Sequence, residues 1–339
     1  MNRNARENFV HLILVKEECY VQVSRKKVRS FASGTLIKLC RYAFFVSFSF
    51  VVLYPYIYIL INSLKGSADY ADPVVQWVPK HLYFGNFASA AKVFELGRTI
   101  GNSLVYEIIP ALLQFCSCAV AGYGLARFDF KGKKILTGIM MLTILVPTMM
   151  IITPSYVNYS HMDFLGILNL ISRIVGHDIR PNLINTPFAF YIPALLGVGL
   201  KGGFFIYIFS QFYRKLPKEL EEAAWMDGAG AWRTFLRIAV PTSGPAAITV
   251  LLFSVVWHWN DYYLAQMYNS EHPTFSVALN NFSVGGVSAA LETGMTIGKA
   301  MAVPILLTGC LLFILPLVIL YILMQKKFIA SITTSGIVG

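Results

Sequence analysis

Charged residues are scarce in this chain, and acidic residues are scarcer than basic ones. Asp, Glu, Lys and Arg make up 13% of the 339 residues, whereas hydrophobic residues make up 56% and the mean hydropathy is +0.60. A soluble domain carries about 25% charged residues, so this composition excludes the ordinary soluble classes and indicates a polytopic membrane protein. The net charge of +11 does not indicate nucleic-acid binding, because the basic residues lie beside apolar runs and form no single stripe.

The known motifs of catalysis are absent as well. The six histidines are scattered and form no HExxH pattern, and neither a nucleophile elbow nor a pair of carboxylates in an apolar stretch occurs. Without a GxxxxGK(S/T) phosphate loop, the chain cannot itself bind and hydrolyse ATP in the P-loop manner. The five cysteines lie mostly in apolar runs and are best explained as small buried residues. We therefore expect a protein that is not an enzyme and that binds no metal or other cofactor of its own.

Six apolar runs are present, and each approaches or exceeds the length that a membrane span needs. About 20 helical residues cross the roughly 30 Å of hydrocarbon in a bilayer. The runs cover residues 40–62, 102–126, 135–156, 187–212, 246–267 and 301–324. The expected fold class is an all-α polytopic membrane protein with about six transmembrane helices.

The distribution of basic residues predicts the direction of these spans. Of the 28 Lys and Arg residues, 20 lie before or at the start of the first run, between the second and third runs, within 213–241, or after the last run. The positive-inside rule places these segments, and with them both termini, in the cytoplasm. The predicted division is a cytoplasmic N-terminal extension (1–39), a transmembrane domain (40–325) and a cytoplasmic C-terminal tail (326–339). The outer segments 63–100, 158–186 and 268–300 suit contact with an extracytoplasmic partner, and equally suit having none.

Residues 213–241 form the only long charged segment between two strongly apolar ones. A proline lies where the first helical residue is expected, three glutamates fill the first turn, where the helix dipole favours anions, and two glycines in the middle allow the helix to end. These residues are Pro217, Glu219, Glu221, Glu222, Gly228 and Gly230. Trp232, Phe235, Leu236 and Ala239 then recur at helical spacing until Pro241. The segment therefore predicts a helix, a glycine bend and a second helix.

Within this segment, Glu222-Ala223-Ala224 is followed four residues after Ala224 by Gly228, and the second helix ends at Pro241. The pattern resembles the EAA loop of permease subunits in bacterial ABC importers, which is short, cytoplasmic and helical and docks in a groove of a separate ATPase. The resemblance therefore implies a role in ATPase coupling for six residues: Glu222, Ala223, Ala224, Asp227, Gly228 and Pro241. An amphipathic pair of interfacial helices is the alternative, but it gives no reason for small residues at these positions.

The resemblance covers nearly everything after about residue 39. It is carried by Asn102-Ser103-Leu104, by residues 121–128, by Pro147, by Gln211-Phe212 and by Trp259-Asn260-Asp261, which are similar to carbohydrate-importer permeases of the maltose-system type. The C-terminal tail is similar too, although Ser331 and Ser335 stand where the family often has glycine and Val338 where it often has a basic residue.

This resemblance implies the type I ABC importer permease architecture and ATP-driven import of a sugar or oligosaccharide by alternating access. The implied partners are a second homologous permease subunit, a cytoplasmic ABC ATPase dimer that holds ATP and Mg²⁺, an extracytoplasmic sugar-binding protein and the lipid bilayer of a bacterial cell membrane. The alternative function is that of a secondary transporter of a small polar solute, driven by an ion gradient. It requires ionisable residues deep in several spans, where they are sparse, and leaves residues 213–241 unexplained.

Polar and aromatic residues near the end of the fifth run are candidates for the substrate pathway. They are Trp257, His258, Trp259, Asn260 and Asp261. Aromatic faces beside an amide and a carboxylate suit a neutral polyhydroxylated ligand, but the same residues also suit the outer aromatic belt of a span. Lys201, followed by Gly202-Gly203, predicts a broken helix in the fourth run that lines a cavity, or a lysine at a span boundary that reaches outward.

Overall fold

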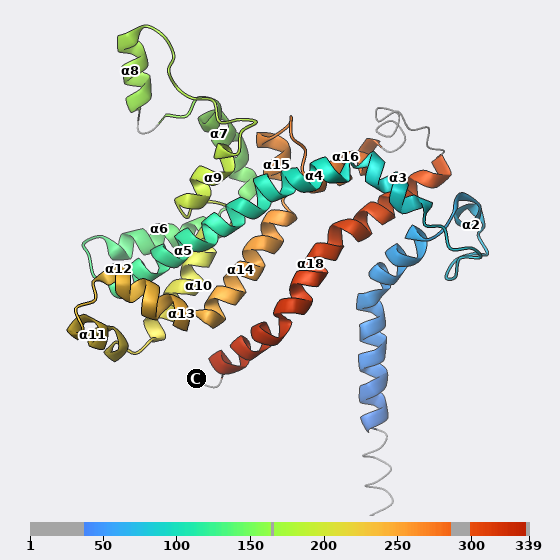
Figure 1. Ribbon diagram of the computed structural model, residues 1–339, viewed down its shortest axis with the longest axis horizontal. Helices are drawn as coiled ribbons and strands as arrows, with labels where there is room; N and C mark the ends of the chain where they lie inside the picture. The colour runs from blue at the N-terminus through green and yellow to red at the C-terminus, as the bar shows by residue number, and fades with distance from the viewer. Residues whose placement is uncertain (1–36, 164–165, 286–298, 337–339) are drawn as a thin grey trace, which may run out of the picture. The chain divides into compact units, whose positions relative to one another are not determined.

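The computed structural model of the protein describes residues 37–163, 166–285 and 299–336 (Figure 1). The chain divides into two compact units, residues 1–59 and residues 60–339, which are considered separately. Nearly all of the predicted N-terminal extension, 1–39, lies outside the described residues, so its role stays a prediction. Among the described residues every regular element is a helix, apart from one isolated bridge between Lys65 and Leu82. The expected all-α fold is confirmed.

Within the second unit the helices follow one another along the chain between residue 67 and residue 336. They are α2 (Ser67–Ala71), α3 (Gly85–Val93), α4 (Leu96–Ser103), η1 (Leu104–Ile108), α5 (Ile109–Arg127), α6 (Lys133–Leu145), α7 (Thr148–Ser160), α8 (Ile167–Val175), α9 (Phe188–Leu195), α10 (Gly202–Lys215), α11 (Glu219–Met226), α12 (Ala231–Thr234), η2 (Phe235–Ala239), α13 (Val240–Thr242), α14 (Gly244–Trp259), α15 (Tyr263–Tyr268), α16 (Phe275–Gly285) and α18 (Lys299–Gly336). The elements η1 and η2 are single turns of π-helix.

The six predicted runs all fall on helices, but not on six straight ones. Ile37–Ser63, Leu96–Arg127 and Met301–Ile329 are long and apolar enough to cross a membrane. Two further pairs reach that length only together, because α6 and α7 meet at 107° and the helix Ala231–Thr242 meets α14 at 81°. By length and composition, the described residues therefore contain three candidate spans, or five if each bent pair is one span.

Proline and left-handed residues explain where the remaining runs break. Val146 and Pro147 are extended between α6 and α7, as expected for a proline and the residue before it. The fourth run divides into α9 and α10, and Lys201 adopts a left-handed backbone with φ of 60° directly before α10. The break predicted at Lys201-Gly202-Gly203 is thus present, and it leaves α10 with 14 residues.

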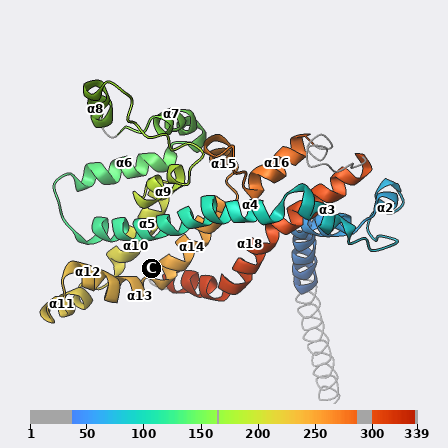
Figure 2. The same cartoon turned by 45° about the horizontal axis from the view of Figure 1, so that its top comes forward.

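The central packing contact joins α5 to α10 (Figures 1 and 2). Gly122 allows the two backbones to approach, because a Cβ at this position would lie 3.0 Å from the backbone nitrogen of Ser210. Around it, the ring of Tyr123 packs edge-on against Tyr213, and Tyr213 stacks on Phe209. Tyr213 and Phe209 are fully buried, so this aromatic cluster forms the core at one end of α5.

A second core lies at the other end of the unit, where α3, α14, α16 and α18 meet. Phe94 packs against Phe275 and Phe282, and Phe275 packs edge-on against Phe313 of α18. These contacts bring the beginning and the end of the second unit together.

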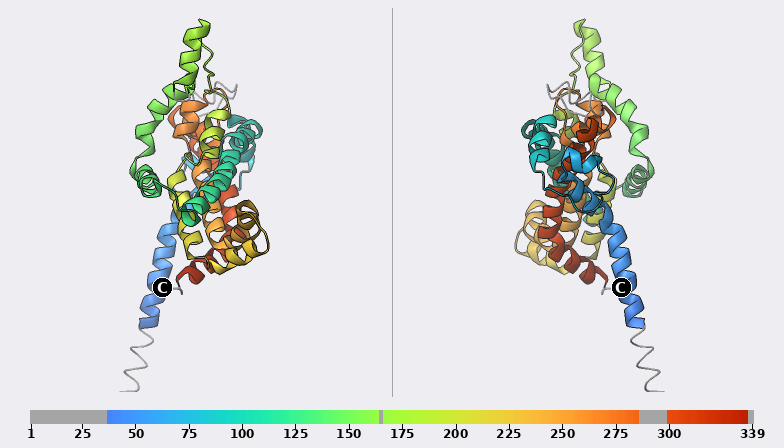
Figure 3. Two further views of the ribbon diagram at one scale, coloured as in Figure 1. Left: turned by 90° about the vertical axis from the view of Figure 1, so that its left-hand side faces the viewer. Right: turned by 90° about the vertical axis from the view of Figure 1, so that its right-hand side faces the viewer.

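Figure 3 places α8 and the α11–α13 segment at opposite ends of the second unit. The C-terminal end of α18 lies at the same end as α11–α13 (Figure 1). The placement of residues 158–186 on one side of the membrane and of 213–241 on the other stays a prediction.

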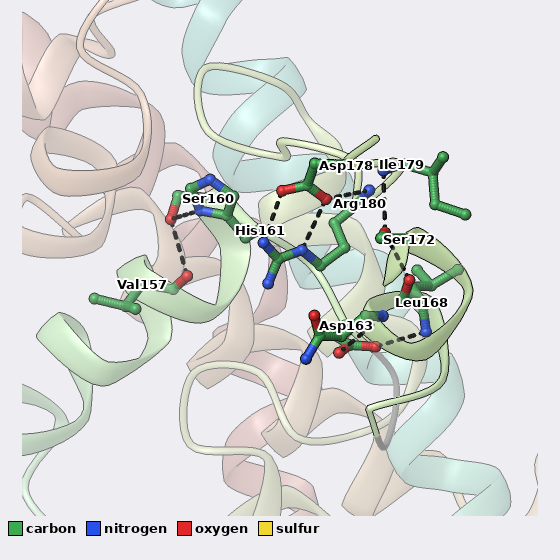
Figure 4. Close-up of polar contacts among 10 residues, drawn as sticks. Val157, Ser160, His161, Asp163, Leu168, Ser172, Asp178, Ile179 and Arg180 are labelled. Atoms are coloured by element: carbon green, nitrogen blue, oxygen red, sulfur yellow. Dashed lines mark hydrogen bonds and ion pairs between the residues drawn. The ribbon is translucent and has the colours of Figure 1, made fainter. Parts of the chain in front are cut away.

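The segment that carries α8 is braced by its own polar side chains (Figure 4). The Asp163 carboxylate accepts hydrogen bonds from the backbone N–H groups of Leu168 (2.9 Å) and Asn169 (3.3 Å) in the first turn of α8. Arg180 donates two hydrogen bonds to Asp178, which lowers the pKa of that carboxyl below its usual range. The described residues of 158–163 and 166–186 therefore make several local hydrogen bonds, although no side chain of α8 is buried.

The contact at Gly122 yields a test of the α5–α10 packing. Gly122→Ala should destabilise the protein by about 1–3 kcal/mol, because the added methyl group must push against the backbone of α10. Gly124→Ala is the matched control in the same helix, since a Cβ there meets nothing within 4 Å. Thermal unfolding of the purified protein in detergent would measure both; equal unfolding temperatures for the two variants would contradict the packing.

Candidate functional site

The segment after α10 folds as the sequence predicts, as two helices around a glycine bend. Helix α11 has Glu219, Glu221 and Glu222 in its first turn, where the N-terminal dipole favours carboxylates. It begins at Glu219, so Pro217 lies two residues before the helix and not at its first position.

A left-handed glycine closes α11. Gly228 has φ of 77°, and its N–H donates to the carbonyl of Trp225 at 3.0 Å while the N–H of Ala229 donates to the carbonyl of Ala224 at 2.9 Å. These two bonds are the Schellman pattern of a helix C-terminus. The spacing of four residues between Ala224 and Gly228 therefore has a structural cause. Gly230 has φ of −74°, a conformation that any residue adopts.

The second helix runs from Ala231 to Thr242 and shows two faces. Phe235 and Ala239 are buried against the aromatic core, whereas Trp232 and Leu236, predicted on the same apolar face, are exposed. Pro241 lies in the last turn, and the helix ends one residue later.

A buried ion pair holds this segment to the end of α5. The Arg127 guanidinium donates through Nε to Glu221 Oε1 at 2.9 Å and through Nη2 to the carbonyl of Leu216 at 2.8 Å. The Arg127 and Glu221 side chains are only 6% and 5% exposed. Sequence reasoning treated Arg127 as one basic residue of a loop and Glu221 as one anion of a helix, and the pairing of the two was missed. Local sequence patterns do not indicate which basic side chain pairs with which acidic one.

The rest of the segment offers an exposed surface, here called the loop face. It consists of five apolar side chains: Leu220, Trp225, Met226, Trp232 and Leu236. Met226 is 89% exposed. Of the predicted coupling residues, Glu222, Ala223, Asp227 and Gly228 are exposed beside them, and Ala224 is half-buried. Several large apolar side chains that are exposed within one short segment are typical of a site of interaction.

A cavity of about 690 Å³ lies along α5, with walls from η1, α6, α7, α9, α10, α14 and α15. Lys201 and Asp261, predicted for the substrate pathway, both line it. Most of the lining is apolar, and Glu107, His258 and Asp261 supply its acidic and imidazole groups. Among the residues that the structure describes, no group of three His, Cys, Asp or Glu side chains is arranged to hold a metal ion.

Trp257, Trp259 and Asn260 lie outside the cavity lining. Trp257 stacks on Phe205 and Phe253 in the core between α10 and α14. Trp259 is buried, and its Nε1–H donates to the carbonyl of Phe313 at 3.0 Å. Asn260 is exposed and donates to the carbonyl of Val256 in its own helix at 2.7 Å. The structure thus separates these three residues from Asp261 and Lys201.

Glu107 is a cavity residue that sequence reasoning did not single out. It lies in η1, the π-helical turn before Pro110. In π-helical bonding the residue at position 110 would donate to the carbonyl of Val105, but proline has no N–H, and the hydroxyl of Tyr191 donates to that carbonyl instead at 3.1 Å. The available signal was an acidic residue near the beginning of an otherwise apolar run, since such residues are costly at membrane depth.

The ion pair yields a test of how the segment is anchored. Arg127→Ala should destabilise the protein by about 3–5 kcal/mol, because it leaves the Glu221 carboxylate buried without a counter-charge. Arg233→Ala is the control on the same segment, where the arginine is exposed, and should change stability by less than about 0.5 kcal/mol. The measurement is thermal unfolding in detergent, and an unchanged unfolding temperature for Arg127→Ala would refute the anchor.

Comparison with known proteins supplies the context for these sites. The family described as "Binding-protein-dependent transport system inner membrane component" matches residues 119–334. The diacetylchitobiose uptake system permease protein NgcG of Streptomyces coelicolor is 28% identical over 230 residues, 68% of each chain. The trehalose transport system permease protein SugB of Mycobacterium tuberculosis is 26% identical over 290 residues, which are 85% of this chain and 93% of SugB.

A solved structure is similar over most of the chain. It belongs to a bacterial ABC transporter involved in the import of the acidic polysaccharide alginate, and it aligns with a TM-score of 0.65 over 87% of this chain and 98% of its own. The sequences are 19% identical, so this likeness concerns the fold alone.

Proposed function

The chain belongs to the family of binding-protein-dependent transport system inner membrane components, and from that premise we propose that it forms part of the path by which an ATP-driven importer carries a sugar or oligosaccharide. It is a multi-pass protein of the bacterial cell membrane with the type I ABC permease fold, and a non-catalytic permease subunit of a carbohydrate ABC importer.

The loop face is the proposed docking site for a cytoplasmic ABC ATPase, one of a dimer that holds ATP and Mg²⁺. The observation that carries this proposal is the combination of five exposed apolar side chains with a buried anchor, Arg127–Glu221. The exposed apolar side chains offer a surface for a partner to bind. The Arg127–Glu221 pair would keep the loop in place on α5 when the partner exerts a force on it. Glu222, Ala223, Asp227 and Gly228 are exposed on the same segment, the Ala224 carbonyl accepts one of the two hydrogen bonds that cap the first helix, and Pro241 lies in the last turn of the second.

The same two helices that hold the loop also form walls of the cavity. Gly124 and Leu125 of α5 line the cavity a few residues before Arg127, and Phe204 and Ile206 of α10 line it before the loop begins. A displacement of the loop by the ATPase therefore moves both walls. We propose that this connection between the loop and the cavity walls produces alternating access.

The proposed partners also include a second homologous permease subunit and an extracytoplasmic sugar-binding protein. The second permease would complete the substrate path, and the binding protein would deliver sugar at the end of the unit that carries α8. Support comes from the family description, which names binding-protein-dependent transport.

Within the cavity, Asp261 and Lys201 are the proposed substrate-pathway residues. Trp257 would act on that path indirectly, because it packs on Phe204 and Phe205, and Phe204 lines the cavity. Trp259 and Asn260 would position the end of α14, which carries Asp261 into the cavity wall.

Topology can be tested by labelling introduced thiols from outside the cell, in a background without native cysteines. A thiol at Ser283 should react with a membrane-impermeant reagent, because α16 lies within the predicted outer segment 268–300, whereas a thiol at Ala229 should not. Labelling at Ala229 in intact cells would overturn the proposed orientation.

Coupling can be tested at the glycine bend. Gly228→Val should weaken ATPase attachment or uncouple hydrolysis from uptake, because a β-branched residue is strained at φ of 77°. Gly230→Val is the matched control two residues away, at φ of −74° and with open space around its Cβ. ATPase retained per permease and sugar uptake in cells are the measurements. Full retention and full uptake in Gly228→Val would remove the support for coupling through this loop.

A further inference from the structure

Acidic side chains gather in one part of the cavity, on elements that are far apart in the sequence. Glu107 comes from η1 and Asp261 from the turn after α14, and His258 on the last turn of α14 lines the same cavity. No ion pair joins any of the three to a lysine or arginine in the described part of the chain. The family description and the relatives' names assign no role to them.

Glu107 differs from the other two because half of its hydrogen-bonding capacity is unused. Glu107 is only 2% exposed. One oxygen, Oε1, accepts a hydrogen bond from the Ser276 hydroxyl at 3.1 Å, and the Ser103 and Thr274 hydroxyls also lie beside the carboxyl group, while Oε2 makes no hydrogen bond of good geometry among the described residues. A buried acceptor without a partner is unfavourable, so such a group is retained where a ligand supplies the missing bond.

Asp261 is satisfied to a greater extent within the fold. Its Oδ1 accepts a hydrogen bond from the N–H of Leu264 at 3.3 Å at the start of α15. Its backbone carbonyl lies 2.9 Å from the same Ser276 hydroxyl, whose single proton is shared between this carbonyl and Glu107 Oε1. Ser276 thus connects the wall that carries Glu107 to the wall that carries Asp261. The two carboxylates belong to one polar site, in which Glu107 has the free acceptor.

The local backbone supports a binding role for Glu107. The residue lies in a π-helical turn, a feature that costs regular hydrogen bonding and occurs frequently at functional sites. The hydroxyl of Tyr191, on α9, donates a hydrogen bond to the carbonyl of Val105 in that turn. A side chain that only filled space would not require this arrangement.

We propose that Glu107 anchors an uncharged saccharide in the cavity by accepting hydrogen bonds from its hydroxyl groups, and that this site disfavours saccharides that carry carboxylates. The inference deepens the proposed function and rests on it. Hydroxyl groups are the donors that a free carboxylate oxygen can accept. A carboxylated sugar would instead bring like charge next to Glu107 and Asp261, with Lys201 as the one fixed cation and no arginine among the lining residues.

A purely structural role for Glu107 is the competing explanation. The hydroxyl that donates a hydrogen bond to Glu107 belongs to Ser276, in the first turn of α16. The carboxylate therefore also lies near the N-terminus of that helix. This contact accounts for Oε1 but not for Oε2. The two explanations predict different results for Glu107→Gln, which keeps an oxygen for Ser276, and for Ser276→Ala, which removes the structural contact and leaves Glu107 intact.

The first experiment measures uptake by the complete importer, purified with the subunits that accompany this chain and reconstituted in liposomes. The probes are trehalose, melibiose, diacetylchitobiose and, as the acidic saccharide, an alginate trisaccharide. For whichever neutral probe is transported, Glu107→Gln should lower the maximal rate about tenfold, without changing basal ATPase activity or assembly. The exposed loop variant Asp129→Asn should stay within about twofold of the wild type, and Ser276→Ala should lower the rate less than Glu107→Gln does.

The second experiment reads the charge of the site without any sugar. A single thiol is introduced by Ser155→Cys, on the α7 wall of the cavity, in a background without native cysteines. A cationic methanethiosulfonate reagent should react at least severalfold faster than an anionic one, and Glu107→Gln should reduce that ratio. A ratio near one in the presence of Glu107 would overturn the inference.

The outcomes separate this inference from the proposed function. If no saccharide is taken up in an ATP-dependent manner while the thiol ratio follows Glu107, the import proposal fails and the acidic site stands. If a neutral saccharide is transported but Glu107→Gln matches the wild type, or Ser276→Ala matches Glu107→Gln, the inference is wrong and the import proposal stands. Transport of the alginate trisaccharide at a rate similar to a neutral probe would also refute the inference.

Discussion

The buried pair between Arg127 and Glu221 is the contact on which the functional arrangement depends. It joins the last residue of α5 to the first turn of α11, and the same guanidinium holds the carbonyl of Leu216 where the chain leaves α10. The end of α5, the first turn of α11 and the residue that follows α10 are therefore joined through one side chain. Removing either charge leaves the other buried and unpaired, so the pair is costly to open. Through this contact the surface loop is held to helices that form walls of the cavity.

This connection allows an exposed surface and an internal cavity to belong to one mechanism. Within the described residues the loop face carries exposed apolar side chains, and α5 and α10 carry both the loop and the cavity walls. Close packing at Gly122 holds the two helices together. Glu107 lines the cavity from the π-helical turn before α5. In the proposed function the ATPase and the substrate would therefore act on opposite ends of the same helix.

The sequence predicted the helical class, the apolar runs and the helix, bend and helix of residues 213–241, because hydrophobic length and glycine positions are local properties. The left-handed Gly228 and the break before Gly202 follow from the same local chemistry. The bends between α6 and α7 and before α14 shorten the runs, because proline and turn geometry act within an apolar segment that composition cannot divide. The partner of Arg127, the burial of Trp259 and the cavity position of Glu107 depend on contacts between distant residues, and no local pattern encodes them.

We propose that the loop and α5 move as one body, and the distance between two spin labels measures this. Labels at Gly124 on α5 and Met226 on α11, in a cysteine-free background, would report the separation of the two helices in the assembled importer. We expect the same distance distribution without nucleotide and with ATP trapped by a non-hydrolysing ATPase variant, and a broadened distribution after Arg127→Ala. A shift of the distribution on ATP binding in the protein with Arg127 intact would show that the loop moves independently of α5.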